Sequence, residues 1–199
     1  MNNEATVFLV DDDPAALRVL SALVRVVFPH VETFSSAADF LAAYRQQPGC
    51  LVLDVAMPGM SGLELHRKLI QDKINLPVIF VTGHGNVPMA VEAMQMGAVN
   101  FLQKPVQEQT LCDSIRRAIE LGVQNRRRRD RRQRVEERLA RLTPGERQVL
   151  DLILEGKINK EIATQLGLST RTIEDRRAKL MQKIGVKSLA ELIQVVMTR

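Results

Sequence analysis

Four short apolar runs of the chain end at, or just before, a side chain that can bind a cation or a phosphoryl group. These side chains are Asp11, Asp12, Asp54, Thr82 and Lys104. Carboxylates held close together repel one another, and a hard cation such as Mg²⁺, which takes oxygen ligands, relieves the repulsion. A carboxylate can also attack phosphorus to form an aspartyl phosphate. Lys104 offers positive charge and Thr82 a hydroxyl donor to phosphoryl oxygens. The residue types therefore predict a Mg²⁺ site beside a phosphoryl-transfer centre, although any one acid alone would more often be a solvated loop residue.

The same runs belong to a regular alternation of expected strands and helices. The expected strands are residues 7–10, 31–34, 50–53, 78–81 and 99–102. Near-continuous apolar strands are typical of a sheet covered on both faces. The alternation predicts an α/β domain with a five-stranded, parallel, doubly wound sheet. Binding sites in such sheets lie outside the carboxyl ends of the strands, where the acids, Thr82 and Lys104 fall. Asp13 is the exception, because it precedes Pro14 as a helix N-cap would.

Charge is divided unevenly along the chain. Residues 1–121 carry nine lysines and arginines against thirteen acids, whereas residues 122–199 carry nineteen against ten, so a net charge of −4 is followed by +9. An acidic front and a basic back predict two domains, the second facing a polyanion. We expect domains at 1–121 and 142–199, joined by an arginine-rich helical linker at 122–141. From residue 124 the linker has no Gly or Pro, so it either continues the preceding helix or forms a mobile connection.

The composition excludes several classes of protein. A hydrophobic content of 45% with 26% charged residues is globular rather than disordered. No apolar run reaches the roughly 18 residues that a membrane span needs, and the polar start does not resemble a secretory signal. Cys50 and Cys112 lack the spacing of metal ligands, so we expect buried free thiols in a reducing cytoplasm.

The basic C-terminal part reads as four short helices, at about residues 144–155, 160–166, 170–184 and 189–197. In the third, Ile173, Leu180, Met181 and Ile184 share one face and are expected to pack inward. The outward face carries Arg171, Asp175, Ala178, Lys179 and Gln182. A helix that presents its N-terminal half after a short turn is a recognition helix. Candidate phosphate contacts are Lys160, Arg176, Lys179, Lys183 and Lys187, although each could be only a solvated surface charge.

Four segments of the front domain resemble the signatures of receiver domains. They are Val10-Asp11-Asp12-Asp13, Leu53-Asp54-Val55-Ala56-Met57-Pro58, Val81-Thr82-Gly83 and Gln103-Lys104-Pro105. The resemblance covers residues 1 to about 121 and implies a flavodoxin-like, CheY-like fold. It implies that Asp54 accepts phosphate from a sensor histidine kinase. Asp11, Asp12, Asp54 and the carbonyl of Ala56 would hold Mg²⁺, and Thr82 and Lys104 would bind the phosphoryl group.

Two further features of this domain follow from the resemblance. Phe101 occupies the position of the family's switch aromatic. The simpler interpretation is a core Phe on the last strand. Residues 81–91, including His84, are especially similar to FixJ-type receivers. Ala56 departs from many relatives, which carry a polar or charged residue there.

The back domain resembles the helix-turn-helix domains of the LuxR, FixJ and NarL type. The matching segments are Leu142 to Leu150, Asn159 to Ala163 and Ser169 to Glu174. The resemblance implies binding of double-stranded DNA, and it adds Thr170, Thr172 and Glu174 to the candidate DNA contacts. Asp175-Arg176 replaces the family's more usual apolar or basic residue followed by His.

These observations predict a transcription regulator rather than an enzyme, with a dimer favoured by phosphorylation. Residues 87–117 resemble the dimer face of the family, while self-repulsion argues against a coiled coil through 126–134. The alternatives are an aspartyl-phosphate hydrolase or flavodoxin-like redox enzyme, an output domain that binds protein, and a receiver that acts only as a dimeriser without phosphorylation. Short strand connections leave little room for the substrate or flavin loops that the enzymes need.

Overall fold

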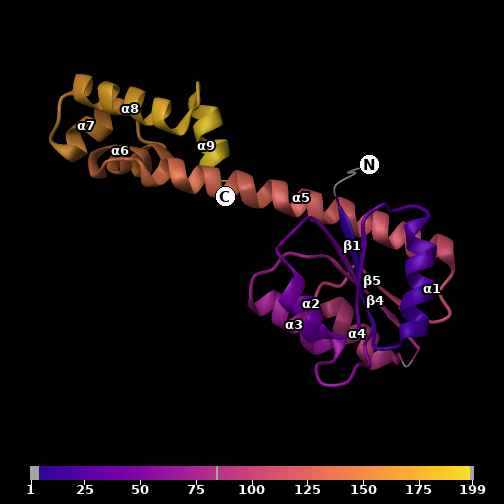
Figure 1. Ribbon diagram of the computed structural model, residues 1–199. Helices are drawn as coiled ribbons and strands as arrows, with labels where there is room; N and C mark the ends of the chain where they lie inside the picture. Colours follow the sequence, from indigo (N-terminus) through magenta and orange to yellow (C-terminus); the bar gives the residue numbers. More distant parts are fainter. Residues whose placement is uncertain (1–4, 84, 198–199) are drawn as a thin grey trace. The chain divides into compact units, whose positions relative to one another are not determined.

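A computed structural model describes residues 5–83 and 85–197 of the chain (Figure 1). The chain forms two compact units, Met1–Arg126 and Arg127–Arg199. His84, part of the FixJ-like stretch, lies outside the described residues.

The first unit is built on one parallel sheet, as the sequence predicts. Its strands are β1 (Thr6–Val10), β2 (Val31–Phe34), β3 (Gly49–Leu53), β4 (Val78–Thr82) and β5 (Asn100–Gln103). They pair in the order β2-β1-β3-β4-β5, and every pairing is parallel. The helices are α1 (Pro14–Arg25), α2 (Ala37–Ala43), α3 (Gly62–Gln71), α4 (Val87–Gln95) and α5 (Glu108–Ala140). Figure 1 shows helices on both sides of the sheet, which confirms the doubly wound α/β prediction.

Alternate side chains of the strands face two separate apolar clusters. Phe8 and Val10 of β1 join the cluster under α2, α3 and α4, whereas Val7 and Leu9 join the cluster under α1 and α5. This two-residue period buries both faces of the sheet. Asp13 accepts a hydrogen bond from the Ala15 amide at 2.8 Å, which confirms it as the cap of α1.

The arginine-rich segment is helical as far as Ala140. The helix α5 runs without a break over 33 residues. A Cβ at Gly122 would lie 3.3 Å from Pro77, and Arg126 donates a hydrogen bond to the Gln46 carbonyl at 2.8 Å, so α5 packs on the first unit as far as Arg126. Farther along, Val135 and Leu139 are buried in the core of the second unit. The segment expected as a linker, 122–141, therefore begins with residues that pack on the first unit and ends with residues that pack in the second.

The second unit contains α6 (Pro144–Leu154), α7 (Asn159–Leu166), α8 (Thr170–Ile184) and α9 (Leu189–Met197), close to the expected ranges. Thr143 and Glu146 form a capping box at the start of α6. Gly167 adopts a left-handed φ of 65° between α7 and α8, a conformation that glycine takes without strain. The turn that separates the two helices is therefore short and sharp. Among the described residues, no helix is long and apolar enough to cross a membrane.

One buried polar side chain of the first unit has an environment that predicts pH dependence. His66 on α3 is 5% exposed and packs edge-on against Phe80, with ring centroids 5.7 Å apart. Its Nδ1 has no hydrogen-bond partner among the described residues. Burial lowers the pKa of His66 below its ordinary value of about 6.5. The unfolded chain therefore binds a proton before the folded one does as the pH falls, and the folded state loses stability in that range.

We expect His66→Met to remove this part of the pH dependence, because a methionine of similar size carries no titrating group. Urea unfolding at about pH 7.5 and about pH 5.5 measures the loss of stability in each protein. The variant should lose less than the wild type over this interval. An equal loss in the two proteins would show that His66 is not the group responsible.

Candidate functional site

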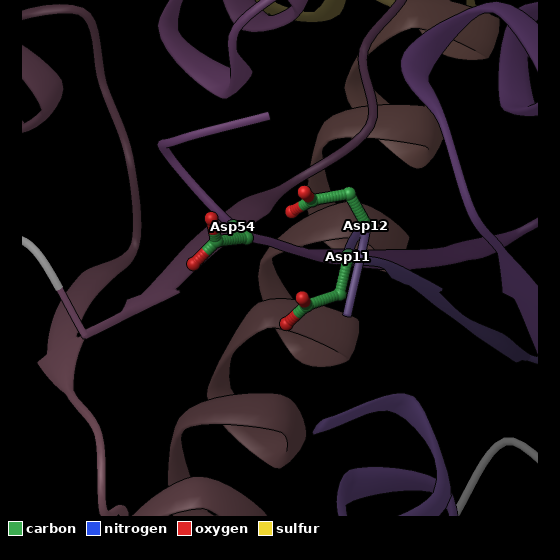
Figure 2. A group of neighbouring side chains, drawn as sticks. All are labelled: Asp11, Asp12 and Asp54. Carbon is green, nitrogen blue, oxygen red and sulfur yellow. The ribbon is translucent and has the colours of Figure 1, made fainter. Parts of the chain in front are cut away.

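Three carboxylates meet at the carboxyl edge of the sheet. Asp11 follows β1 directly, and Asp54 follows β3, with its amide bonded to the Val10 carbonyl at 2.9 Å. Figure 2 shows the side chains of Asp11, Asp12 and Asp54 gathered there, and one oxygen from each lies within 4.8 Å of the others. Asp11 and Asp54 are buried, whereas Asp12 is exposed. The structure therefore brings together the acids that the sequence assigned to one site.

Lys104, just after β5, carries the positive charge of this site. Its Nζ lies 2.5 Å from Asp11 Oδ2 and 3.2 Å from Asp54 Oδ1. Burial raises the pKa of Asp11, and the hydrogen bond from Lys104 partly offsets that rise. Burial lowers the pKa of Lys104, but its hydrogen bond to Asp11 and the charge of Asp54 outweigh this, so the net pKa is raised. The lysine is thus held in its charged form beside two carboxylates.

Three further residues that the sequence assigned to this site are Ala56, Thr82 and Phe101. The Ala56 amide donates a hydrogen bond to Asp54 Oδ2 at 2.9 Å, which fixes the loop after β3 against the carboxylate. Thr82 ends β4 and is fully buried. Phe101 on β5 is half-buried and lies against Phe80, with ring centroids 6.0 Å apart.

The donor set suits a hard divalent cation. Three carboxylates converge, and no thiolate or imidazole is grouped with them among the described residues. Oxygen donors of this kind bind Mg²⁺ or Ca²⁺ rather than zinc or copper. The acidic triad is therefore consistent with a divalent metal site.

A glycine that the sequence analysis did not single out also shapes this edge. A Cβ at Gly62 would lie 2.0 Å from the Asp54 carbonyl oxygen, so α3 can begin this close to the acidic site only without a side chain there. The sequence shows a glycine after the capping residue Ser61, but no local pattern tells that it approaches Asp54.

In the second unit, α8 presents the expected outward face. Ser169 caps the helix by accepting a hydrogen bond from the Thr172 amide at 3.1 Å. Ile173, Leu180 and Ile184 are buried, and Met181 packs against the same core. The exposed positions of α8 include Thr170, Arg171, Glu174, Asp175, Ala178, Lys179 and Gln182, while Thr172 and Arg176 are half-buried. Lys160 is exposed on α7 and Lys187 just after α8.

Two of the basic residues proposed to contact DNA interact with other residues of the second unit. Lys183 Nζ lies 2.6 Å from the buried Glu146 Oε2, and its hydrogen bond lowers the pKa of Glu146. The guanidinium of Arg176 packs over Gly145, where a Cβ would lie 2.8 Å from Arg176 Nη1. Arg177, which the sequence analysis did not select, donates to Asn159 Oδ1 at 2.6 Å and ties α8 to α7. Spacing alone does not distinguish these lysines and arginines from those that remain in solvent.

Comparisons with known proteins agree with both units. Residues 7–116 match the family of response regulator receiver domains, and residues 140–196 match the luxR family of bacterial regulatory proteins. The response regulator protein TodT of Pseudomonas putida is 42% identical, over 98% of this chain and 87% of its own. The transcriptional regulatory protein FixJ of Azorhizobium caulinodans is 40% identical, over 99% and 94%.

Two solved structures of relatives match this chain over nearly its whole length. The response regulator StyR matches with a TM-score of 0.87 and 43% identity, over 98% of this chain and all of its own. Full-length FixJ from B. japonicum matches with a TM-score of 0.60 and 38% identity, over 98% and 96%. The relatives are regulators, so the enzyme alternatives are not supported. The chain belongs to the two-component response regulators, as a DNA-binding regulator of transcription with an N-terminal receiver domain and a C-terminal LuxR-type helix-turn-helix domain.

Proposed function

We propose that Asp54 accepts a phosphoryl group from a sensor histidine kinase and that this modification shifts receiver dimerisation and DNA binding. The observation that carries the proposal is the position of Asp54 between Lys104, 3.2 Å away, and the Ala56 amide, 2.9 Å away. In the transfer, a carboxylate oxygen of Asp54 bonds to phosphorus while the bond from phosphorus to the kinase imidazole breaks. The imidazole nitrogen keeps the electron pair. Lys104 and Thr82 would bind the phosphoryl oxygens.

We assign the metal site to Mg²⁺, with Asp11, Asp12, Asp54 and the carbonyl of Ala56 as ligands. Bound there, the cation would neutralise charge on the phosphoryl oxygens. Asp11 and Asp12 hold the site on the β1 side, and Asp54 contributes both a ligand and the acceptor. The free, buried thiols of Cys50 and Cys112 support the proposal that the protein works in the cytoplasm.

The role of Asp12 gives a direct test of the metal assignment. Asp12→Ala should weaken Mg²⁺ binding and slow phosphorylation by acetyl phosphate, because an exposed carboxylate ligand is lost. Titrating Mg²⁺ against the rate of modification should shift the half-saturating concentration upward by about tenfold or more. The matched control is Asp13→Ala, which removes a neighbouring carboxylate that caps α1 and should leave the metal dependence unchanged. If Asp12→Ala showed the same Mg²⁺ dependence as the wild type, Asp12 would not be a ligand of the metal.

We propose that phosphorylation favours a homodimer through the face formed by α4, β5 and the start of α5, residues 87–117. Val87, Val91 and Met94 support this, because these large apolar side chains of α4 are 76%, 49% and 48% exposed. The phosphoryl group would shift an existing equilibrium rather than build a new fold.

Light scattering across a range of protein concentrations, with and without beryllium fluoride as a phosphoryl mimic, tests the dimer. The mimic should raise the dimer fraction at every intermediate concentration. A mass that does not change with the mimic would contradict this part of the proposal.

For the second domain, we propose that α8 enters the major groove of double-stranded DNA. The candidate contacts are Lys160, Thr170, Arg171, Thr172, Glu174, Asp175, Arg176, Ala178, Lys179 and Lys183. The exposure of Arg171, Asp175 and Lys179 on one side of the capped helix supports this role. Lys183 would have to leave Glu146 to reach a phosphate, so we expect it to contribute less than Lys179.

A further inference from the structure

The loop between β4 and α4 contains a glycine that touches two residues of the proposed switch. A Cβ at Gly85 would lie 2.7 Å from Cε1 of Phe101, 3.0 Å from its Cζ and 3.0 Å from Cγ2 of Thr82. Carbon atoms in contact lie about 3.5–4.0 Å apart. A methyl group at Gly85 therefore cannot coexist with the present positions of both side chains.

The conflict at Gly85 is steric and does not arise from the backbone. The φ of Gly85 is outside the left-handed range, unlike that of Gly59 or Gly97, so an alanine can adopt the backbone conformation. Gly83, two residues earlier in the same loop, would have no atom within 4 Å of an added Cβ. The loop therefore offers a pair of glycines that differ in what a side chain would meet.

The Phe101 ring has a second ring beside it on the neighbouring strand. Phe101 of β5 is paired with Phe80 of β4, which is fully buried and packs against His66. In a closely packed interior an added methyl group is accommodated only when neighbouring atoms move. A methyl at Gly85 must therefore displace the Phe101 ring, move the loop, or move Thr82.

We propose that Gly85 is a positioning residue of the switch, whose missing side chain lets Thr82 and Phe101 occupy adjoining space. Thr82 lies at the site of phosphorylation, and Phe101 lies on β5 within the proposed dimer face. Both residues border the space that a side chain at Gly85 would occupy, and this shared space connects the two. The inference rests on the proposed function, because it concerns how phosphorylation of Asp54 changes dimerisation through that face.

The test compares full-length Gly85→Ala with the control Gly83→Ala. Sedimentation velocity gives the dimerisation constant of each protein with and without beryllium fluoride and Mg²⁺, and the ratio of the two constants measures the coupling. Gly85→Ala should reduce this ratio by about tenfold, within the range usual for coupled sites. Gly83→Ala should keep the wild-type ratio. Modification of Asp54 by acetyl phosphate should proceed in both variants.

A second substitution shows whether the effect passes through the ring. Phe101→Leu removes the two ring atoms that the new methyl would meet. Adding Gly85→Ala to Phe101→Leu should therefore reduce the ratio by less than it does in the wild-type background, because only the contact with Thr82 remains and the two effects are not additive. An equal reduction in both backgrounds would overturn the inference, and so would a wild-type ratio in Gly85→Ala alone. Loss of cooperative unfolding in Gly85→Ala that Phe101→Leu does not restore would overturn it as well.

The wild-type arm separates this inference from the proposed function. A wild-type protein that does not dimerise with beryllium fluoride overturns the proposed function, and the inference falls with it. A wild-type protein that responds, together with a Gly85→Ala variant that responds equally, overturns the inference alone.

Discussion

Replacing Asp54 by asparagine is expected to abolish phosphorylation of this protein. The amide has nearly the same shape as the carboxylate, but it cannot form an acyl phosphate. It also keeps an oxygen that can accept the hydrogen bond from the Ala56 amide, so the loop after β3 should keep its position. Incubation with acetyl phosphate and Mg²⁺, followed by a phosphate-affinity gel, should show the shifted band for the wild type and none for Asp54→Asn.

The matched control for this experiment is Asp13→Asn. Asp13 belongs to the same acidic region but caps α1 from an exposed position, and asparagine caps a helix about as well as aspartate. Its phosphorylation should equal that of the wild type. A shifted band that persists in Asp54→Asn would place the phosphate on another residue.

Asp175→Ala is expected to change which DNA sequence the protein selects, while leaving its affinity for random DNA equal or higher. Asp175 is exposed near the N-terminal end of α8. In the major groove a carboxylate is repelled by phosphates and can only accept hydrogen bonds, so its natural partner is the amino group of cytosine. Removing it should relax base preference at one position by about 1–3 kcal/mol. Selection of binding sites from a random pool measures this change.

Lys179→Ala provides the contrasting substitution on the same face of α8. The exposed Lys179 ammonium is expected to contact phosphate, so its loss should weaken binding to all sequences and lower the salt slope by about one unit. The selected site should stay the same. If Asp175→Ala leaves the selected site unchanged, the acid only complements the helix dipole, and Arg171 becomes the next candidate for base recognition.

The strands and the acidic site could be predicted because each depends on a local pattern. Apolar runs of strand length mark β1, β3 and β4, and parallel strands carry the residues after them to one edge. That rule puts Asp11, Asp54 and Lys104 at one edge of the sheet, whereas the contacts among their side chains depend on the strand order, which the structure supplies. The helical form of residues 122–140 was not decided by the sequence, because an arginine-rich segment is compatible with a helix or with a solvated coil.

Contacts between distant residues could not be predicted in the same way. The ion pair of Lys183 with Glu146 joins α8 to the start of α6 across 37 residues of sequence, and either side chain alone reads as a surface charge. The closeness of Gly85 to Phe101 depends on how the loop before α4 folds over β5, which no periodicity describes. The buried imidazole of His66 likewise occupies an inward position of α3 that its polarity would not suggest.

The most direct test of the central claim is DNA binding as a function of phosphorylation. A footprint on a fragment that carries a selected site would be titrated with wild-type protein and with Asp54→Asn, each with and without acetyl phosphate and Mg²⁺. We predict that the phosphodonor lowers the wild-type concentration needed for half protection and leaves Asp54→Asn unaffected. Equal protection with and without the phosphodonor in the wild type, or the same gain in Asp54→Asn, would contradict control of DNA binding through Asp54.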